Sequence, residues 1–168
     1  MSHTAFFSIK TCKVVYILFS CILVFILIIW CAVSVVDKRK VQIELEINNI
    51  NTYFDGMFQV YKIPSWIERS AAQTDVSELY NINYLLQTDE DTRRTMKNWD
   101  GRDIPVLAGL PYYPFASEYE VQRCYNKLNS EEKTKYIVIS KSIIYIGHCS
   151  EEKKETLEAA AEFFRKQN

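Results

Sequence analysis

The N-terminal part of the chain contains one long apolar run without a charge. Residues 14–36 read VVYILFSCILVFILIIWCAVSVV. A helix of this length rises about 34 Å, which is enough to cross a hydrocarbon core of about 30 Å. Because the run has no polar face, it does not fit the core helix of a small soluble domain. We therefore expect a transmembrane helix, preceded by a short tail of residues 1–13.

The same run is too long for the apolar core of a cleaved signal peptide, which spans about 7–15 residues. Trp30 and Val36 also stand where a cleavage site would need small residues. We expect an uncleaved signal-anchor in a single-pass protein, with the lipid bilayer as one of its partners.

Apolar residues continue beyond this run at alternating spacings of four and three, which is typical of a helix with one apolar face. We expect an amphipathic juxtamembrane helix over residues 37–63, ended by Pro64. Its apolar face packs either against the chain's own domain or, in a coiled-coil stalk, against another membrane protein. The candidate partner-binding residues on this face are Ile43, Ile47, Ile50, Phe54 and Met57.

The remaining residues, 64–168, predict a small soluble domain. Capping patterns and apolar periodicity indicate its helices. We expect helices over residues 75–87, 89–99, 117–128 and 150–166. Residues 135–147 read KYIVISKSIIYIG, which predicts a hairpin, and residues 104–110 predict a short strand.

The fold class expected from these elements is α+β. A single N-terminal transmembrane helix continues as an amphipathic helix, followed by a soluble domain of short helices. The strands form a β-hairpin or a three-stranded antiparallel sheet, because two strands alone are marginal in water.

Three aromatic residues framed by prolines form the segment PYYPF at residues 111–115. Such a segment predicts a rigid loop, which either folds onto the domain's own core or serves as a contact surface. The secondary candidates for partner binding are Tyr112, Tyr113 and Phe115.

Two of the five cysteines, Cys124 and Cys149, belong to the soluble part. In an oxidising compartment we expect them to form a disulfide, which would contribute about 3.5 kcal/mol. The alternative is two unlinked thiols in a cytoplasmic domain. The bases on the two sides of the anchor, Lys10 and Lys13 against those at 38–40, nearly balance and do not decide the orientation. The disulfide predicts a cytoplasmic N-terminus and a periplasmic domain at a cell inner membrane.

The sequence contains no motif that points to an enzyme. Adjacent side chains of a strand point to opposite faces, so His148 does not suit the role of a base for Cys149. The soluble part has too few nitrogen and sulfur ligands for a zinc site. A net charge of -1 does not fit a nucleic-acid-binding face. We expect no catalytic residue, metal, cofactor or nucleic acid.

These features predict a non-enzymatic accessory protein that scaffolds or assembles a membrane-spanning complex through its juxtamembrane helix and extracytoplasmic domain. The expected partners are other membrane or envelope proteins, with a homo-oligomer as a further option. The layout of anchor and stalk is similar to that of inner-membrane assembly proteins of type IV pilus and type II secretion systems.

Two alternatives stay open. The first is a pilin-like structural subunit of a filament, although residues 14–36 contain neither the glycine nor the glutamate that a pilin has near its apolar helix. The second is a membrane-tethered thiol protein that uses Cys124 or Cys149.

Overall fold

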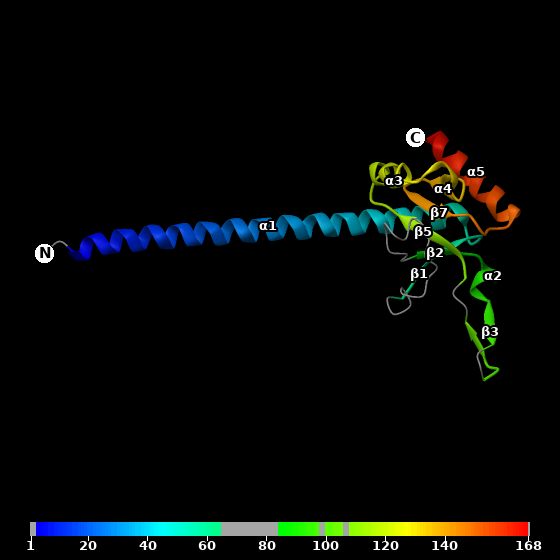
Figure 1. The fold of residues 1–168 in the computed structure, drawn as a ribbon, viewed down its shortest axis with the longest axis horizontal. Helices are drawn as coiled ribbons and strands as arrows, with labels where there is room; N and C mark the ends of the chain where they lie inside the picture. The colour runs from blue at the N-terminus through cyan, green and yellow to red at the C-terminus, as the bar shows by residue number, and fades with distance from the viewer. Residues whose placement is uncertain (1–2, 65–83, 98–99, 106–107, 168) are drawn as a thin grey trace. The chain divides into compact units, whose positions relative to one another are not determined.

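A computed structural model of the protein describes residues 3–64, 84–97, 100–105 and 108–167 (Figure 1). The chain divides into two compact units between Val41 and Gln42. The first unit contains most of the long helix α1 (His3–Phe54), and the second is a mixed domain that includes the last residues of α1. The expected α+β class is confirmed in general terms: a long apolar N-terminal helix precedes a small domain of strands and short helices.

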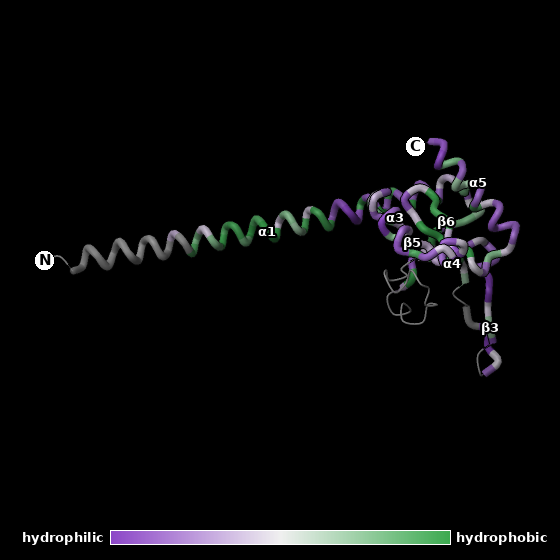
Figure 2. Tube along the Cα trace, turned by 45° about the horizontal axis from the view of Figure 1, so that its top comes forward, coloured by the Kyte–Doolittle hydropathy of each residue, from purple (hydrophilic) through white to green (hydrophobic). Residues whose placement is uncertain are grey.

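Helix α1 carries the apolar run. Within the described part of the chain it is the one helix that is long and apolar enough to cross a membrane. None of the side chains in its most apolar eighteen-residue window is buried by the rest of the chain. Figure 2 shows this stretch of the helix as mostly hydrophobic (green), with a few pale turns. Exposed apolar side chains over this length favour lipid as their surroundings.

The helix ends at Phe54, so the expected helical boundary at residue 63 is wrong. Asp55 and Gly56 have positive φ angles of 40° and 84°, which do not occur within a right-handed helix. The chain reverses at these two residues and enters strand β1 (Gln59–Lys62). The glycine therefore ends the helix, whereas the sequence indicated only a weak point within it.

The domain is built on a five-stranded antiparallel sheet with the order β1-β2-β5-β7-β6. It has two strands more than the largest sheet expected. The strands after β1 are β2 (Tyr84–Gln87), β5 (Leu110–Pro114), β6 (Tyr136–Ile139) and β7 (Ser142–Tyr145). A separate two-stranded ribbon pairs β3 (Thr95–Lys97) with β4 (Asp103–Pro105).

Helices cover both faces of the five-stranded sheet. On one face, Ile50 and Phe54 of α1 pack together with Leu157 and Phe164 of α5 (Glu151–Gln167). On the other face, α3 (Glu118–Tyr125) packs its buried side chains, including Val121, against the sheet. Two further single-turn helices are α2 (Asp89–Thr92) and α4 (Ser130–Lys133). The sheet is therefore the middle layer of the domain.

Several local expectations are confirmed. The hairpin forms as β6 and β7, and Ser117 caps α3 by accepting a hydrogen bond from the N–H of Glu120 at 3.3 Å. Helix α5 follows Ser150 as expected. Its buried stripe is the predicted one, Leu157, Ala160, Ala161 and Phe164.

Other expectations are wrong. Residues 84–87 form β2 and not the end of a helix. Both faces of this strand are covered, so its sequence lacks the alternation of apolar and polar residues by which a strand is recognised. The rest of the expected helix 75–87 lies outside the described residues. Within the expected helix 89–99, residues 89–92 form α2 and residues 95–97 form β3, whereas residues 98–99 lie outside the described residues. The strand expected at 104–110 is divided between β4 and the start of β5.

The segment PYYPF is a strand and not a loop. It forms most of β5, which lies between β2 and β7. Pro111 pairs with Leu85 of β2, whereas Pro114 pairs with Ser142 of β7. Each proline is thus in register with only one neighbouring strand, and backbone N–H groups alternate between the two edges of a strand. Both prolines fit because neither has to donate on its paired side.

Candidate protein-interaction site

The predicted helical contact face is largely part of the domain core. Ile50 is fully buried and Phe54 is 5% exposed, so both pack within the chain. Ile43 and Ile47 are half-buried, and Ile47 lies against the same core cluster. Met57 lies beyond the end of the helix and is 57% exposed. Of the predicted face, Ile43, Ile47 and Met57 keep surface that a partner could reach.

The predicted aromatic contact surface is also internal. Tyr112, Tyr113 and Phe115 are between 0% and 3% exposed. Side chains alternate along β5, so Tyr112 belongs to the core cluster on the α1 and α5 face, and the other two belong to the cluster on the α3 face. These aromatics stabilise the fold and present no contact surface.

The expected disulfide between Cys124 and Cys149 is not formed in the structure. Cys124 is buried in the cluster on the α3 face, whereas Cys149 packs against the cluster on the opposite face of the sheet. The cysteines therefore give no support to a periplasmic domain. Burial, assisted by the charge of Glu151, raises the pKa of the Cys149 thiol, which is the opposite of what a reactive thiol needs.

A groove of about 640 Å³ lies along the outer edge of β6, between α3 and α5. Helix α3 lines it with Val121 and Tyr125, and α5 lines it with Ala161 and Phe164. Strand β6 contributes its residues Tyr136–Val138. Because β6 is the last strand of the sheet among the described residues, this groove is an open sheet edge between two helices.

The backbone register shows which polar groups face the groove. The N–H of Ile146 donates to the carbonyl of Lys135 at 2.8 Å, and Ile137 lies opposite Ile144. In an antiparallel pair, backbone groups of successive residues point to alternate edges. The backbone N–H and C=O groups of Lys135 and Ile137 therefore face β7, and those of Val138 face the groove.

The ionisable lining of the groove is mainly acidic. Glu118, Glu158 and Glu162 carry three carboxylates, against the single guanidinium of Arg165. The ammonium of Lys166 lies 2.7 Å from the carboxylate of Glu162 and holds the pKa of that carboxyl below its usual value. The lining residues have a formal charge of -2, or -1 when Lys166 is counted with its partner Glu162, and this favours a basic ligand.

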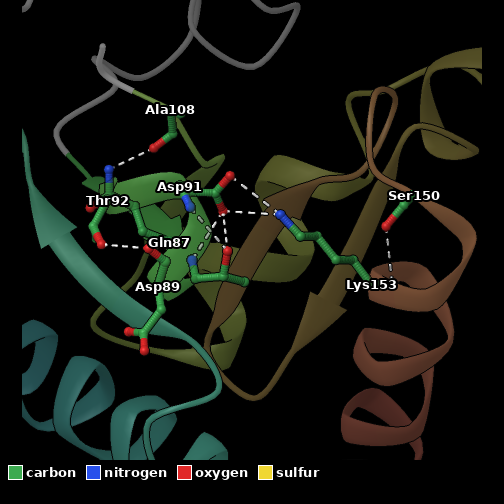
Figure 3. Close-up of polar contacts among 8 residues, drawn as sticks. Gln87, Asp89, Asp91, Thr92, Ala108, Ser150 and Lys153 are labelled. Atoms are coloured by element: carbon green, nitrogen blue, oxygen red, sulfur yellow. Dashed lines mark hydrogen bonds and ion pairs between the residues drawn. The ribbon is translucent and has the colours of Figure 1, made fainter. Parts of the chain in front are cut away.

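Outside the groove, two buried carboxylates have shifted pKa values. Figure 3 shows the first, Asp91 of α2, whose carboxylate faces Lys153 of α5. Its carboxylate accepts hydrogen bonds from the N–H and hydroxyl of Thr88 and from the ammonium of Lys153, at 3.0, 2.9 and 3.0 Å. Burial alone would raise the pKa of Asp91, but these donors hold it below its usual value. The carboxylate of Asp91 thus links α2 to α5.

The second buried carboxylate is Glu46 of α1, which is 4% exposed. It accepts hydrogen bonds from the Ser140 hydroxyl at 3.0 Å and from the Lys141 N–H at 2.9 Å. Ser140 has a positive φ of 51°, so these bonds hold a turn that a side chain disfavours. Burial raises the pKa of Glu46 above its usual value, although the two hydrogen bonds act in the opposite direction.

The groove was not found from the sequence. The YIVI pattern of β6 predicts a strand, but it does not tell whether β6 or β7 lies at the edge. The one available signal is that β6 itself contains no lysine and no proline. Over the described ranges, no group of three or more His, Cys, Asp or Glu side chains is arranged to hold a metal ion.

Comparisons with protein-family models, with curated proteins and with solved structures found no match to this chain. The function is therefore inferred from the features of the chain itself.

The burial of Glu46 predicts how stability depends on pH. Since its folded pKa is raised, the native state retains its proton longer than the unfolded state, and stability falls as the pH rises above about 4.5. Glu46→Gln removes this penalty, so its free energy of unfolding relative to wild type should increase with pH over that range. Urea unfolding of the full chain in detergent micelles at several pH values measures the difference.

The matched control is Glu44→Gln, which removes a carboxylate from the exposed surface of the same helix. A difference between Glu46→Gln and wild type that stays constant with pH would contradict the inferred burial of the charged group.

Proposed function

We propose that this chain is a single-pass membrane protein whose folded domain binds a second protein, as a non-enzymatic scaffolding or assembly subunit of a membrane-spanning complex. The observation that carries the proposal is the open edge of β6 between α3 and α5. A sheet edge exposes backbone donors and acceptors that another polypeptide can pair with.

The apolar part of α1 supports a membrane location. None of the described side chains in its most apolar eighteen-residue window is buried, and its length suits a bilayer. The last turns of the same helix contribute Ile50 and Phe54 to the domain core. The apolar run and the first core residues of the domain thus belong to the same helix in the sequence.

A binding role also fits the chemistry of the shifted groups. Glu46 and Asp91 have their carboxylate oxygens engaged by donors of the fold itself. Neither carboxylate lines the groove. The pKa values of Glu46 and Asp91 are shifted because these carboxylates hold a turn and a helix in place. The groove is a separate feature, and it presents surface and charge to a ligand.

A pilin-like filament subunit is the second candidate. One observation favours it: the end of a long apolar helix packs on an antiparallel sheet, through Ile50 and Phe54. In a filament the apolar helices would pack against one another, so the contacts between copies decide between the two candidates.

The membrane anchor predicts a specific response to charge. Leu27→Arg places a cation near the centre of the apolar run and should disfavour insertion by about 3 kcal/mol. We expect the wild-type chain to stay with the membranes after alkaline extraction and the variant to be released in part. Leu45→Arg, on an exposed position of the same helix beyond the run, is the matched control. Equal retention of the two variants would contradict the anchor.

The binding role predicts where contacts with other proteins occur. A photo-crosslinking amino acid at Glu158 or Met57, both exposed, should capture a second protein in native membranes, to be identified by mass spectrometry. The same amino acid at the buried position Ile50 should give links within the chain only.

Two outcomes would contradict the scaffolding role. If all three positions yield links within the chain alone, the domain has no stable partner. If the captured protein is a second copy, and Cys21 and Cys31 of the apolar run also become cross-linked between copies on oxidation, the filament subunit takes its place.

A further inference from the structure

Within the described part of the chain, the four residues of β6 include no side chain that would hinder pairing at the edge of the sheet. Natural proteins use lysines, prolines or bulges at a sheet edge to keep it from pairing with another chain. None of these interrupts β6, whose residues Tyr136–Ile139 are all uncharged and pair with β7 in regular register. The outer edge opens into the groove between α3 and α5, to which the backbone groups of Val138 point.

We propose that the groove binds an extended, basic segment of a partner protein, which adds to the sheet as a strand beside β6. The inference rests on the proposed binding function and names the kind of ligand that serves it.

The backbone requires an extended ligand. A helix satisfies its own N–H and C=O groups, so it has none to offer to the edge of β6. An extended segment can pair with the N–H and C=O of Val138 and continue the hydrogen-bond pattern of the sheet. Its side chains then alternate between the α3 wall and the α5 wall of the groove.

Charge selects a basic segment over a second copy of this chain. Each wall carries an acid, Glu118 on α3 and Glu158 on α5, and the lining as a whole is negative. Two copies paired through β6 would bring two acidic grooves together, which like-charge repulsion disfavours. Lysine or arginine side chains on the α5 side of an added strand would instead lie opposite the exposed carboxylate of Glu158.

The test uses the full chain in lipid nanodiscs and a fluorescent synthetic peptide of alternating lysine and valine. A second peptide has the same sequence with alternate backbone nitrogens methylated, so that it cannot donate along one edge. A third has glutamate in place of lysine. We expect the first peptide to bind, as measured by fluorescence anisotropy, and the other two to bind at least about tenfold more weakly.

Protein variants locate the site. Glu158→Lys reverses a charge of the lining and should weaken binding of the lysine peptide about tenfold. Glu155→Lys makes the same change on an exposed position of α5 outside the lining and should leave binding unchanged. Val138→Pro removes the N–H that faces the groove without removing a bond to β7, and should abolish binding while circular dichroism stays native. If Val138→Pro fails to fold, the charge variants and the methylated peptide decide.

The proposal is overturned if the lysine peptide does not bind. It is also overturned if the affinity is unchanged by methylation of the peptide backbone or by Glu158→Lys. It is also overturned if the free chain is a dimer in nanodiscs that dissociates in the Val138→Pro variant, since a second copy then occupies the edge. Crosslinking of a partner from Met57 without any binding of the peptide would overturn strand addition and leave the proposed scaffolding function standing.

Discussion

The pairing of β5 with β7 is the contact on which the rest of the domain depends. It joins Tyr112 to Ile144, which are distant in sequence, and so inserts β7 between β5 and its hairpin partner β6. This order buries the aromatic residues of β5 on both faces and leaves β6 at the end of the sheet. The open groove is therefore a direct result of one non-local strand pairing.

Both faces of the sheet are covered by helices. The last turns of α1 and helix α5 share one face, and α3 takes the other. This places Glu46 of α1 over the turn between β6 and β7, where the Ser140 hydroxyl and Lys141 N–H satisfy its carboxylate. Ser140 also lines the groove, so the contact between α1 and the hairpin sets one end of the candidate site.

Local signals in the sequence predicted the elements that depend on local physics. The apolar run, the cap at Ser117 and the stripe on α5 are all of this kind. Some of the errors have a shared cause, because burial on both faces removes the polar alternation that identifies a strand. This applies to β2 and to β5, whose prolines also suggested a loop. The edge position of β6 follows from the pairing of β5 with β7, which no local pattern encodes.

The central claim, that β6 keeps an open edge beside Val138, is tested most directly by amide hydrogen exchange of the full chain in nanodiscs without a partner. Ile137 and Val138 are neighbours in one strand, so global unfolding exposes both amides equally. If the edge is open, the amide of Val138 exchanges far faster than that of Ile137, which faces β7. Equal protection of the two amides would show that the edge is already covered and would contradict the account.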